Sequence, residues 1–175
     1  MRRSAPPRDR EASTDVGGAR EAALRLLERT RRTRADLERR LRAKGFAEGT
    51  VGEALERLAG VGLVDDVEFA RAWLAGRWGR RPAGWRRLEQ ELRVRGISGD
   101  DITAARARLE DEQGVGDELA AARKVVVLTE RRMAALEPRV RRRRLYALLA
   151  RRGFDGDTIE RALSGRGSEE DADEA

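Results

Sequence analysis

The segment LEQELRVRGI, from Leu88 to Ile97, decides the fold, because the chain contains its pattern three times. Each copy has a leucine, a second leucine four residues later, a glycine four residues after that, and then a large apolar residue. A β-branched aliphatic residue follows five positions further on, and an alanine three positions after it. So many matches at fixed offsets indicate a repeat protein. The copies are Leu37, Leu41, Gly45, Phe46, Val51 and Ala54; Leu88, Leu92, Gly96, Ile97, Ile102 and Ala105; and Leu145, Leu149, Gly153, Phe154, Ile159 and Ala162.

The repeated pattern is typical of a helix that ends at its glycine. Leucines four residues apart lie on one helical face, and glycine often ends a helix in the left-handed conformation. An amphipathic segment precedes each copy and another follows it, so each unit has three helices. A unit of roughly 45 residues has a core that is only marginally stable by itself. Neighbouring units should therefore stabilise one another. The predicted fold class is all-α, with three tandem three-helix repeats in an elongated array.

The repeat boundaries follow from the helix starts and stops. Thr33, Asp65 and Ser98 are predicted N-caps, and each has an acidic residue three positions later. Pro138 fits the first position of a helix. We expect a polar linker over 110–116 and a helix over about 117–136. The predicted segments are a disordered basic arm (1–18), the three repeats (19–64, 65–112 and 113–165) and a disordered acidic tail (166–175).

The composition excludes several kinds of chemistry. The chain has no cysteine and no histidine, so disulfides, thiolate nucleophiles, zinc fingers and imidazole-based triads are impossible. The acidic pairs Asp65-Asp66 and Asp100-Asp101 are alternatives for a metal or acid–base site, but both lie at predicted helix starts, where carboxylates cap free N–H groups. We therefore expect a protein that is not an enzyme and needs no cofactor or metal.

Two features bear on the cellular compartment. The longest apolar run, 125–128, is much too short to span a bilayer. No apolar segment follows the first residues, so they do not form a secretory signal. We expect a cytoplasmic protein that does not contact membranes.

The charge is unevenly distributed. The formal net charge is +6, but five of the 32 acidic residues fall in the last eight positions, which leaves 27 against 38 basic residues elsewhere. Such a basic body favours polyanionic partners such as nucleic acid. Alternatively, the frequent arginines reflect genome composition.

Basic residues recur around the second helix of each predicted repeat, where arginine can bind phosphates bidentately. The alternative is that these are solvated helix faces. Trp73 is expected in the core, whereas Trp78 and Trp85 fit either the core or a base-stacking surface. The candidate binding residues are Arg39, Arg40, Lys44, Arg80, Arg81, Arg86, Arg87, Arg93, Arg139, Arg142, Arg143 and Arg151.

Two motifs resemble the RecX family of bacterial regulatory proteins. The segment LVDDVEFA (63–70) has the pattern Asp-Asp-x-x-Phe-Ala, and 84–92 has Gly-x-x-x-Leu-x-x-Glu-Leu. The resemblance extends over about 19–165, whereas the basic arm and the acidic tail match no motif of the family. The residues that carry it are Asp65, Asp66, Phe69, Leu88, Leu92 and Gly96.

The resemblance implies a curved array of three repeats and a non-enzymatic role. A RecX-type protein is expected to bind the RecA recombinase–DNA filament and to modulate, most often inhibit, recombination and co-protease activity in DNA repair and the SOS response. The expected partners are RecA, single-stranded DNA and double-stranded DNA, and the chain is expected to be monomeric. A curved array of basic units could lie in the filament groove and gain affinity through several contacts. The alternatives are a stand-alone helical DNA-binding protein or transcription factor, and a helical adaptor without nucleic-acid contact.

Overall fold

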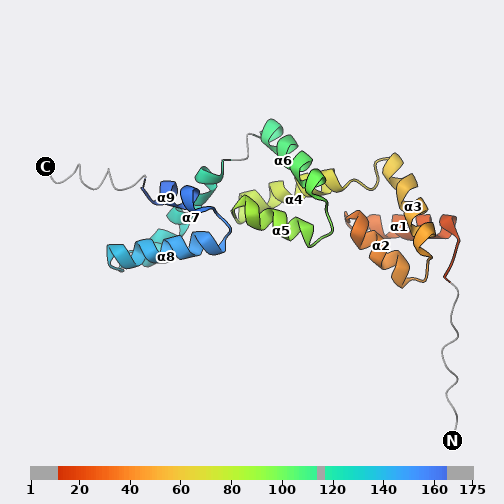
Figure 1. Ribbon diagram of the computed structural model, residues 1–175, viewed down its shortest axis with the longest axis horizontal. Coiled ribbons are helices and arrows are strands. Elements are labelled where there is room, and N and C mark those ends of the chain that lie inside the picture. Colours follow the sequence, from red (N-terminus) through yellow and green to blue (C-terminus); the bar gives the residue numbers. More distant parts are fainter. Residues whose placement is uncertain (1–11, 114–116, 165–175) are drawn as a thin grey trace, which may run out of the picture. The chain divides into compact units, whose positions relative to one another are not determined.

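The computed structural model describes residues 12–113 and 117–164, which form nine α-helices, one short 3₁₀ helix and no strand (Figure 1). The described residues up to Phe69, together with 95–97, form one compact unit, and 70–94 with 98–164 form a second. The predicted all-α class is confirmed. The helices are α1 (Val16–Leu27), α2 (Arg34–Ala43), α3 (Glu48–Gly60), α4 (Asp66–Arg80), α5 (Trp85–Arg93), α6 (Gly99–Gln113), α7 (Glu118–Glu130), η1 (Arg131–Met133), α8 (Pro138–Arg151) and α9 (Gly156–Ser164).

The three copies of the repeated pattern form α2, α5 and α8, which we call the signature helices. Both leucines of each signature helix are buried, because their four-residue spacing places them on the face that packs against the other helices. The β-branched residue and the alanine of each copy are buried on the following helix, which completes the core of that repeat. The predicted three-helix repeat is therefore confirmed.

A glycine in the left-handed region ends each signature helix. The φ angles are +93° at Gly45, +82° at Gly96 and +85° at Gly153. The next residue turns back over the helix, because the N–H of Phe46 donates to the Leu41 carbonyl and that of Phe154 to the Leu149 carbonyl, each at 3.3 Å. This arrangement satisfies carbonyl groups that the helix end would otherwise leave free.

The predicted helix starts have their capping bonds. The Thr33 hydroxyl accepts from the Asp36 N–H at 3.1 Å, and the Asp65 carboxylate accepts from the Glu68 N–H at 2.8 Å. The Ser98 hydroxyl accepts from the N–H of Asp101 at 3.1 Å. Pro138 is the first residue of α8, as predicted.

Three helix boundaries differ from the prediction. Helix α1 begins at Val16 rather than near Ala19, because the Asp15 carboxylate caps the Gly18 N–H at 2.9 Å. Helix α6 continues to Gln113, since Glu110, Glu112 and Gln113 of the expected linker are good helix formers. Helix α7 ends at Glu130 and tightens into η1 instead of continuing to 136. The remainder of the expected arm (1–11), positions 114–116 and the acidic tail lie outside the described residues.

The start of α2 is capped by residues of the second repeat that belong to the same compact unit. The backbone N–H of Arg34 donates to the Asp66 carboxylate at 2.9 Å. The Thr33 hydroxyl donates to the Arg95 carbonyl at 2.9 Å. Asp65 thus caps its own helix, whereas Asp66 caps α2.

The start of α5 repeats this arrangement with residues of the third repeat, inside the second compact unit. The backbone N–H of Trp85 donates to the Glu118 carboxylate at 3.0 Å, and the N–H of Gly84 donates to the Arg152 carbonyl at 3.0 Å. Each of these two signature helices is therefore capped by the first acidic residue of the helix that opens the next repeat. Because these bonds satisfy helix N–H groups that would otherwise be unpaired, they hold consecutive repeats together.

Candidate nucleic-acid interface

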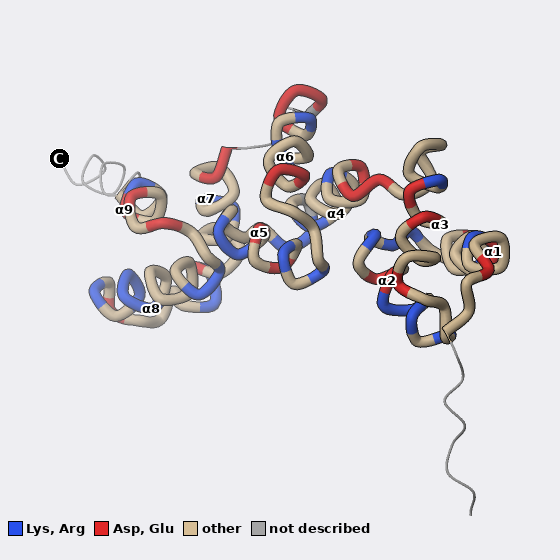
Figure 2. Tube along the Cα trace, turned by 45° about the vertical axis from the view of Figure 1, so that its right-hand side comes forward, with Lys and Arg blue, Asp and Glu red and all other residues tan. Residues whose placement is uncertain are grey.

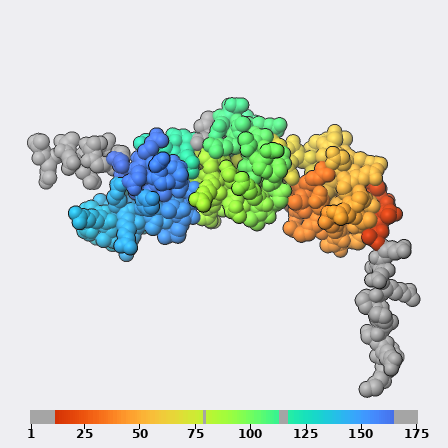
Figure 3. Space-filling model, viewed as in Figure 1, coloured from red at the N-terminus to blue at the C-terminus, as the bar shows by residue number. Residues whose placement is uncertain are grey.

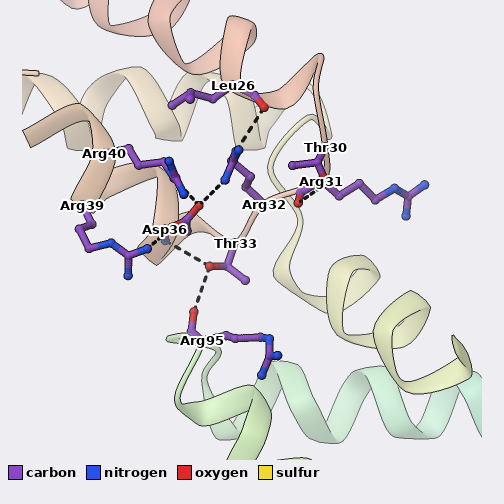
Figure 4. A network of polar contacts seen from close by, with 9 residues as sticks. All are labelled: Leu26, Thr30, Arg31, Arg32, Thr33, Asp36, Arg39, Arg40 and Arg95. Atoms are coloured by element: carbon purple, nitrogen blue, oxygen red, sulfur yellow. Dashed lines mark hydrogen bonds and ion pairs between the residues drawn. The ribbon is translucent and has the colours of Figure 1, made fainter. Parts of the chain in front are cut away.

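The arginines around Asp36 on α2 are held by a shared carboxylate (Figure 4). Arg32 Nη1 and Arg40 Nε lie 2.8 and 2.7 Å from the same Asp36 oxygen, and Arg39 pairs with the other oxygen. Arg32 also donates to the Leu26 carbonyl at 3.2 Å. Burial alone would raise the pKa of Asp36, but the hydrogen bonds from Arg40 and Arg32 outweigh it and hold this pKa below its ordinary value. Asp36 thus gives Arg32, Arg39 and Arg40 a shared acidic partner, although its single negative charge offsets only one of their three positive charges.

The other basic residues of α2 have acidic partners as well, apart from one at its end. Arg34 pairs with Glu38 at 3.3 Å and with Glu56 at 2.8 Å, and the Glu56 hydrogen bond raises its pKa. Lys44 is exposed, and no carboxylate in the described part of the chain forms an ion pair with it. Among the predicted binding residues near α2, only Lys44 keeps its charge free of such pairs.

The positive charge of the arginines on and around α5 is partly compensated by acidic residues. Arg77 and Arg87 both lie 3.0 Å from the same oxygen of Glu91, and these arginines hold the Glu91 pKa below its ordinary value although burial would raise it. Arg93 pairs more loosely with Glu89, at 3.6 Å. Three further candidates are exposed and have no ion pair with a described carboxylate, namely Arg80, Arg81 and Arg86.

Helix α8 contains no acidic residue, and its arginines appear in blue along it in Figure 2. Arg142 pairs with Glu160 of α9. The other arginines form no ion pair with any carboxylate that the structure describes, and nearly all of them are exposed. Figure 3 shows α8 at the surface of the second compact unit. These arginines are Arg139, Arg141, Arg143, Arg144 and Arg151.

The tryptophans pack within the second unit. The rings of Trp78 and Trp85 lie 4.6 Å apart, Trp85 is only 5% exposed, and Trp78 packs against the core of the third repeat. Arg106 covers the Trp85 ring at 4.3 Å, which is a cation–π contact. Of the two alternatives for Trp78 and Trp85, packing is therefore the one that the structure supports. Trp73, expected in the core, is instead half-buried, and the Arg77 guanidinium lies 5.9 Å from its ring centre.

Tyr146 is an exposed aromatic residue that is not among the predicted binding residues. It is 39% exposed and lines a hollow on α8 together with Arg139, Arg142 and Arg143. A signal was present in the repeat itself, because the residue after the first signature leucine is Glu38 in α2, Glu89 in α5 and tyrosine in α8. Tyr146 thus stands where the other two repeats have a carboxylate.

Two kinds of site receive no support in the part of the chain that the structure describes. No three acidic, histidine or cysteine residues there gather into a group that could hold a metal ion. The carboxylates of Asp65 and Asp66 each accept a backbone N–H, and that of Asp101 accepts the Ser98 hydroxyl at 2.7 Å. None of the described helices is both long and apolar enough to cross a membrane.

Repeat architecture and charge together define the class. The chain is an all-helical tandem-repeat protein, and in its third repeat a signature helix presents arginines that no described carboxylate compensates. Such a surface suits a polyanionic partner.

Three family models match successive parts of the chain. They describe the first three-helix domain of RecX over residues 19–58, the second over 65–105 and the third over 116–163. The chain therefore belongs to the RecX family.

Related sequences agree with this assignment. A protein named "Regulatory protein RecX" from Thermobifida fusca (strain YX) is 39% identical over 165 residues, which cover 92% of this chain and 85% of the relative. Its namesake from Mycobacterium avium (strain 104) is 36% identical over 155 residues, covering 88% and 87%. The relatives are thus named as regulators.

Solved structures share the fold. The crystal structure of RecX from Lactobacillus salivarius matches with a TM-score of 0.76 at 20% identity, and the match covers 86% of this chain and 96% of that one. A second, titled "Crystal structure of regulatory protein RecX", matches with a TM-score of 0.71 at 25% identity, covering 83% and 71%.

Proposed function

We propose that this chain binds the RecA recombinase–DNA filament and inhibits its recombinase and co-protease activities. Membership of the RecX family supports the partner, and the uncompensated arginines of α8 are the observation that carries the mode of binding. The chain acts in the cytoplasm as a monomer, without a cofactor and without catalysis. Its role is regulatory, because it covers a surface of the filament that extension and strand exchange require.

Inhibition follows from the way in which several weak basic sites act together. Each exposed arginine contributes a modest, salt-dependent attraction to phosphates or to acidic protein surfaces. Sites on one chain bind at high effective concentration once the first is engaged, so the whole binds far more tightly than any part. A chain held in this way along a filament blocks its extension and excludes a second DNA strand.

Strand exchange with purified RecA tests the proposal. Adding the protein at low salt should slow strand exchange and lower the DNA-dependent ATPase rate, and both effects should weaken as salt rises, because screening shortens the reach of exposed charges. Unchanged rates at saturating protein and low salt would sink the proposal.

A stand-alone DNA-binding protein is a second candidate, which the same α8 arginines favour. It would bind duplex DNA tightly and sequence-selectively without RecA. A gel-shift comparison of random and genomic duplex separates the two candidates. Strong selectivity for a few genomic sites, with no effect on strand exchange, would favour the second.

A further inference from the structure

The signature position occupied by Tyr146 distinguishes α8 from its two counterparts. In α2 the corresponding Glu38 pairs with Arg34 at 3.3 Å, and in α5 Glu89 pairs with Arg93 at 3.6 Å. On α8 the position holds an aromatic ring, and no acidic residue stands anywhere on the helix. The ring therefore stands where α2 and α5 each have an acidic partner for one of their own arginines.

The surroundings of Tyr146 form an open hollow of about 500 Å³ on α8. Arg139 and Arg143 lie one helical turn apart, Arg142 stands one turn before the tyrosine, and all three line the hollow. The tyrosine hydroxyl lies near the start of α9, 3.8 Å from the position that a Cβ on Gly156 would occupy. The hollow therefore combines a partly exposed ring with guanidinium groups, two of which have no ion pair with a described carboxylate.

We propose that this hollow is a subsite for single-stranded nucleic acid, in which one base stacks on Tyr146 while flanking phosphates bind Arg139 and Arg143. The inference deepens the proposed function and rests on its nucleic-acid contact. Stacking on an aromatic side chain tolerates any base, because every base has a π face, and adjacent arginines neutralise the backbone.

Single strands fit the hollow better than the two other anionic partners. In a duplex the base faces are stacked on one another, so a surface ring has no free face to meet. An acidic protein surface would engage the arginines through its carboxylates and would leave the partly exposed ring without a role. The pairing of ring and arginines therefore indicates a ligand that has both flat faces and phosphates.

The test uses the full chain without recombinase and two fluorescent oligomers of equal length, an oligothymidylate and an abasic deoxyribose-phosphate strand. Fluorescence anisotropy should show that the wild-type chain binds the oligothymidylate about tenfold more tightly, a difference equivalent to about 1.4 kcal/mol. Tyr146→Ala should remove this preference and leave abasic binding unchanged. Tyr146→Phe and Tyr146→Trp should retain it.

Two controls separate stacking from charge and folding. Glu38→Ala changes the equivalent position of α2 and should leave the preference for bases intact. Tyr146→Glu, which gives α8 the residue type of its counterparts, should weaken binding of both oligomers. If Tyr146→Ala melts earlier than the wild-type chain, the comparison of the two oligomers on the wild-type chain and on Tyr146→Phe still decides.

Three results would overturn the subsite. The first is equal wild-type affinity for both oligomers, and the second is a Tyr146→Ala chain that keeps the preference for bases. The third is a chain that binds neither oligomer but loses RecA binding on Arg139→Gln and Arg143→Gln, which would assign the hollow to an acidic protein surface. RecA inhibition that survives Tyr146→Ala leaves the proposed function standing, so the two failures are distinguishable.

Discussion

Helices α2 and α8 have the same repeated pattern, but their arginines differ in whether they have acidic partners. On α2 a single carboxylate, Asp36, serves Arg32, Arg39 and Arg40, whereas most arginines of α8 have no described acidic partner. The leucines and the final glycine are the same in both, so the fold does not require either arrangement. A high arginine count therefore does not by itself identify a binding surface, and the local carboxylates decide whether the charge is available.

The largest expected effect comes from neutralising α8. Replacing Arg139, Arg143 and Arg144 with glutamine should reduce the salt slope for single-stranded DNA by about 2, since each lost phosphate contact contributes about 0.7. At 0.1 M salt this corresponds to roughly hundredfold weaker binding, or about 2.8 kcal/mol. The matched change on α2, at Arg39, Arg40 and Arg42, should cost less than threefold, because these arginines have acidic partners, Glu48 at 2.7 Å in the case of Arg42. Equal losses on both helices would remove the distinction between them.

The glycines that end the two helices should also differ. Alanine at either position is strained at positive φ, which costs about 1 kcal/mol. A Cβ at Gly45 meets nothing within 4 Å, but one at Gly153 would lie 2.5 Å from the Arg87 Cβ and 2.9 Å from its backbone nitrogen. We expect Gly45→Ala to lower the free energy of unfolding by about 1 kcal/mol and Gly153→Ala by about 2 kcal/mol. Denaturant melts measure both, and equal values would show that the contact with Arg87 is not tight.

Removing the carboxylate of α2 should make that helix more like α8. Asp36→Asn should lower the free energy of unfolding by about 1 kcal/mol at neutral pH, since the carboxylate is mostly buried and shared by three arginines. Nucleic-acid binding should strengthen severalfold, because the same arginines are released.

The pH dependence of this variant has a definite sign. The pKa of Asp36 is held below its ordinary value of 3.8, so its contribution is complete above that value and is lost as the pH falls through the folded-state pKa. The wild-type chain and Asp36→Asn should therefore converge in stability in acid. A difference that persists unchanged at the lowest pH would contradict the ion-pair explanation.

The smallest expected effect concerns the acidic tail. Deleting 168–175 removes five carboxylates and should tighten DNA binding about threefold at low salt, with little difference at high salt, where screening dominates. A much larger gain would mean that the tail supplies the counter-charge that α8 lacks among its described neighbours. The arginines of α2 and α8 would then both have acidic partners, and the two helices would differ only in where in the sequence these partners lie.

The repeat could be predicted from sequence because its signals are local. Leu88, Leu92 and Gly96 lie within nine residues, and a helix needs only that spacing to bury one face and to end. The hydrogen bonds between repeats could not be predicted from the sequence. Asp66 and Arg34 are 32 residues apart, and no sequence pattern links an acidic residue to the N–H of a distant helix. The curved shape implied by the family resemblance stays a prediction.

The candidate site could be predicted only in part. Arginine positions are plain in the sequence, and pairs four residues apart, such as Arg34–Glu38 and Arg87–Glu91, follow helical spacing. Partners such as Glu56 of Arg34 depend on tertiary packing and could not be anticipated. The sequence alone shows that α8 has no acidic residue. The significance of this follows only from comparison with α2, whose arginines form ion pairs in the structure. The binding role of the individual arginines stays a prediction.

The bond that joins repeats has no counterpart at two places in the described chain. Within the chain, a helix N–H meets the acidic residue that opens the next repeat, Asp66 or Glu118, whereas the first repeat opens with Val16, which has no carboxylate. At the other end, α8 begins with Pro138, which has no N–H, a full turn further from its first leucine than α2 or α5 begins. Two copies meeting head to tail would therefore lack both halves of the bond that joins repeats. We therefore expect that copies of the chain do not extend one another through this bond.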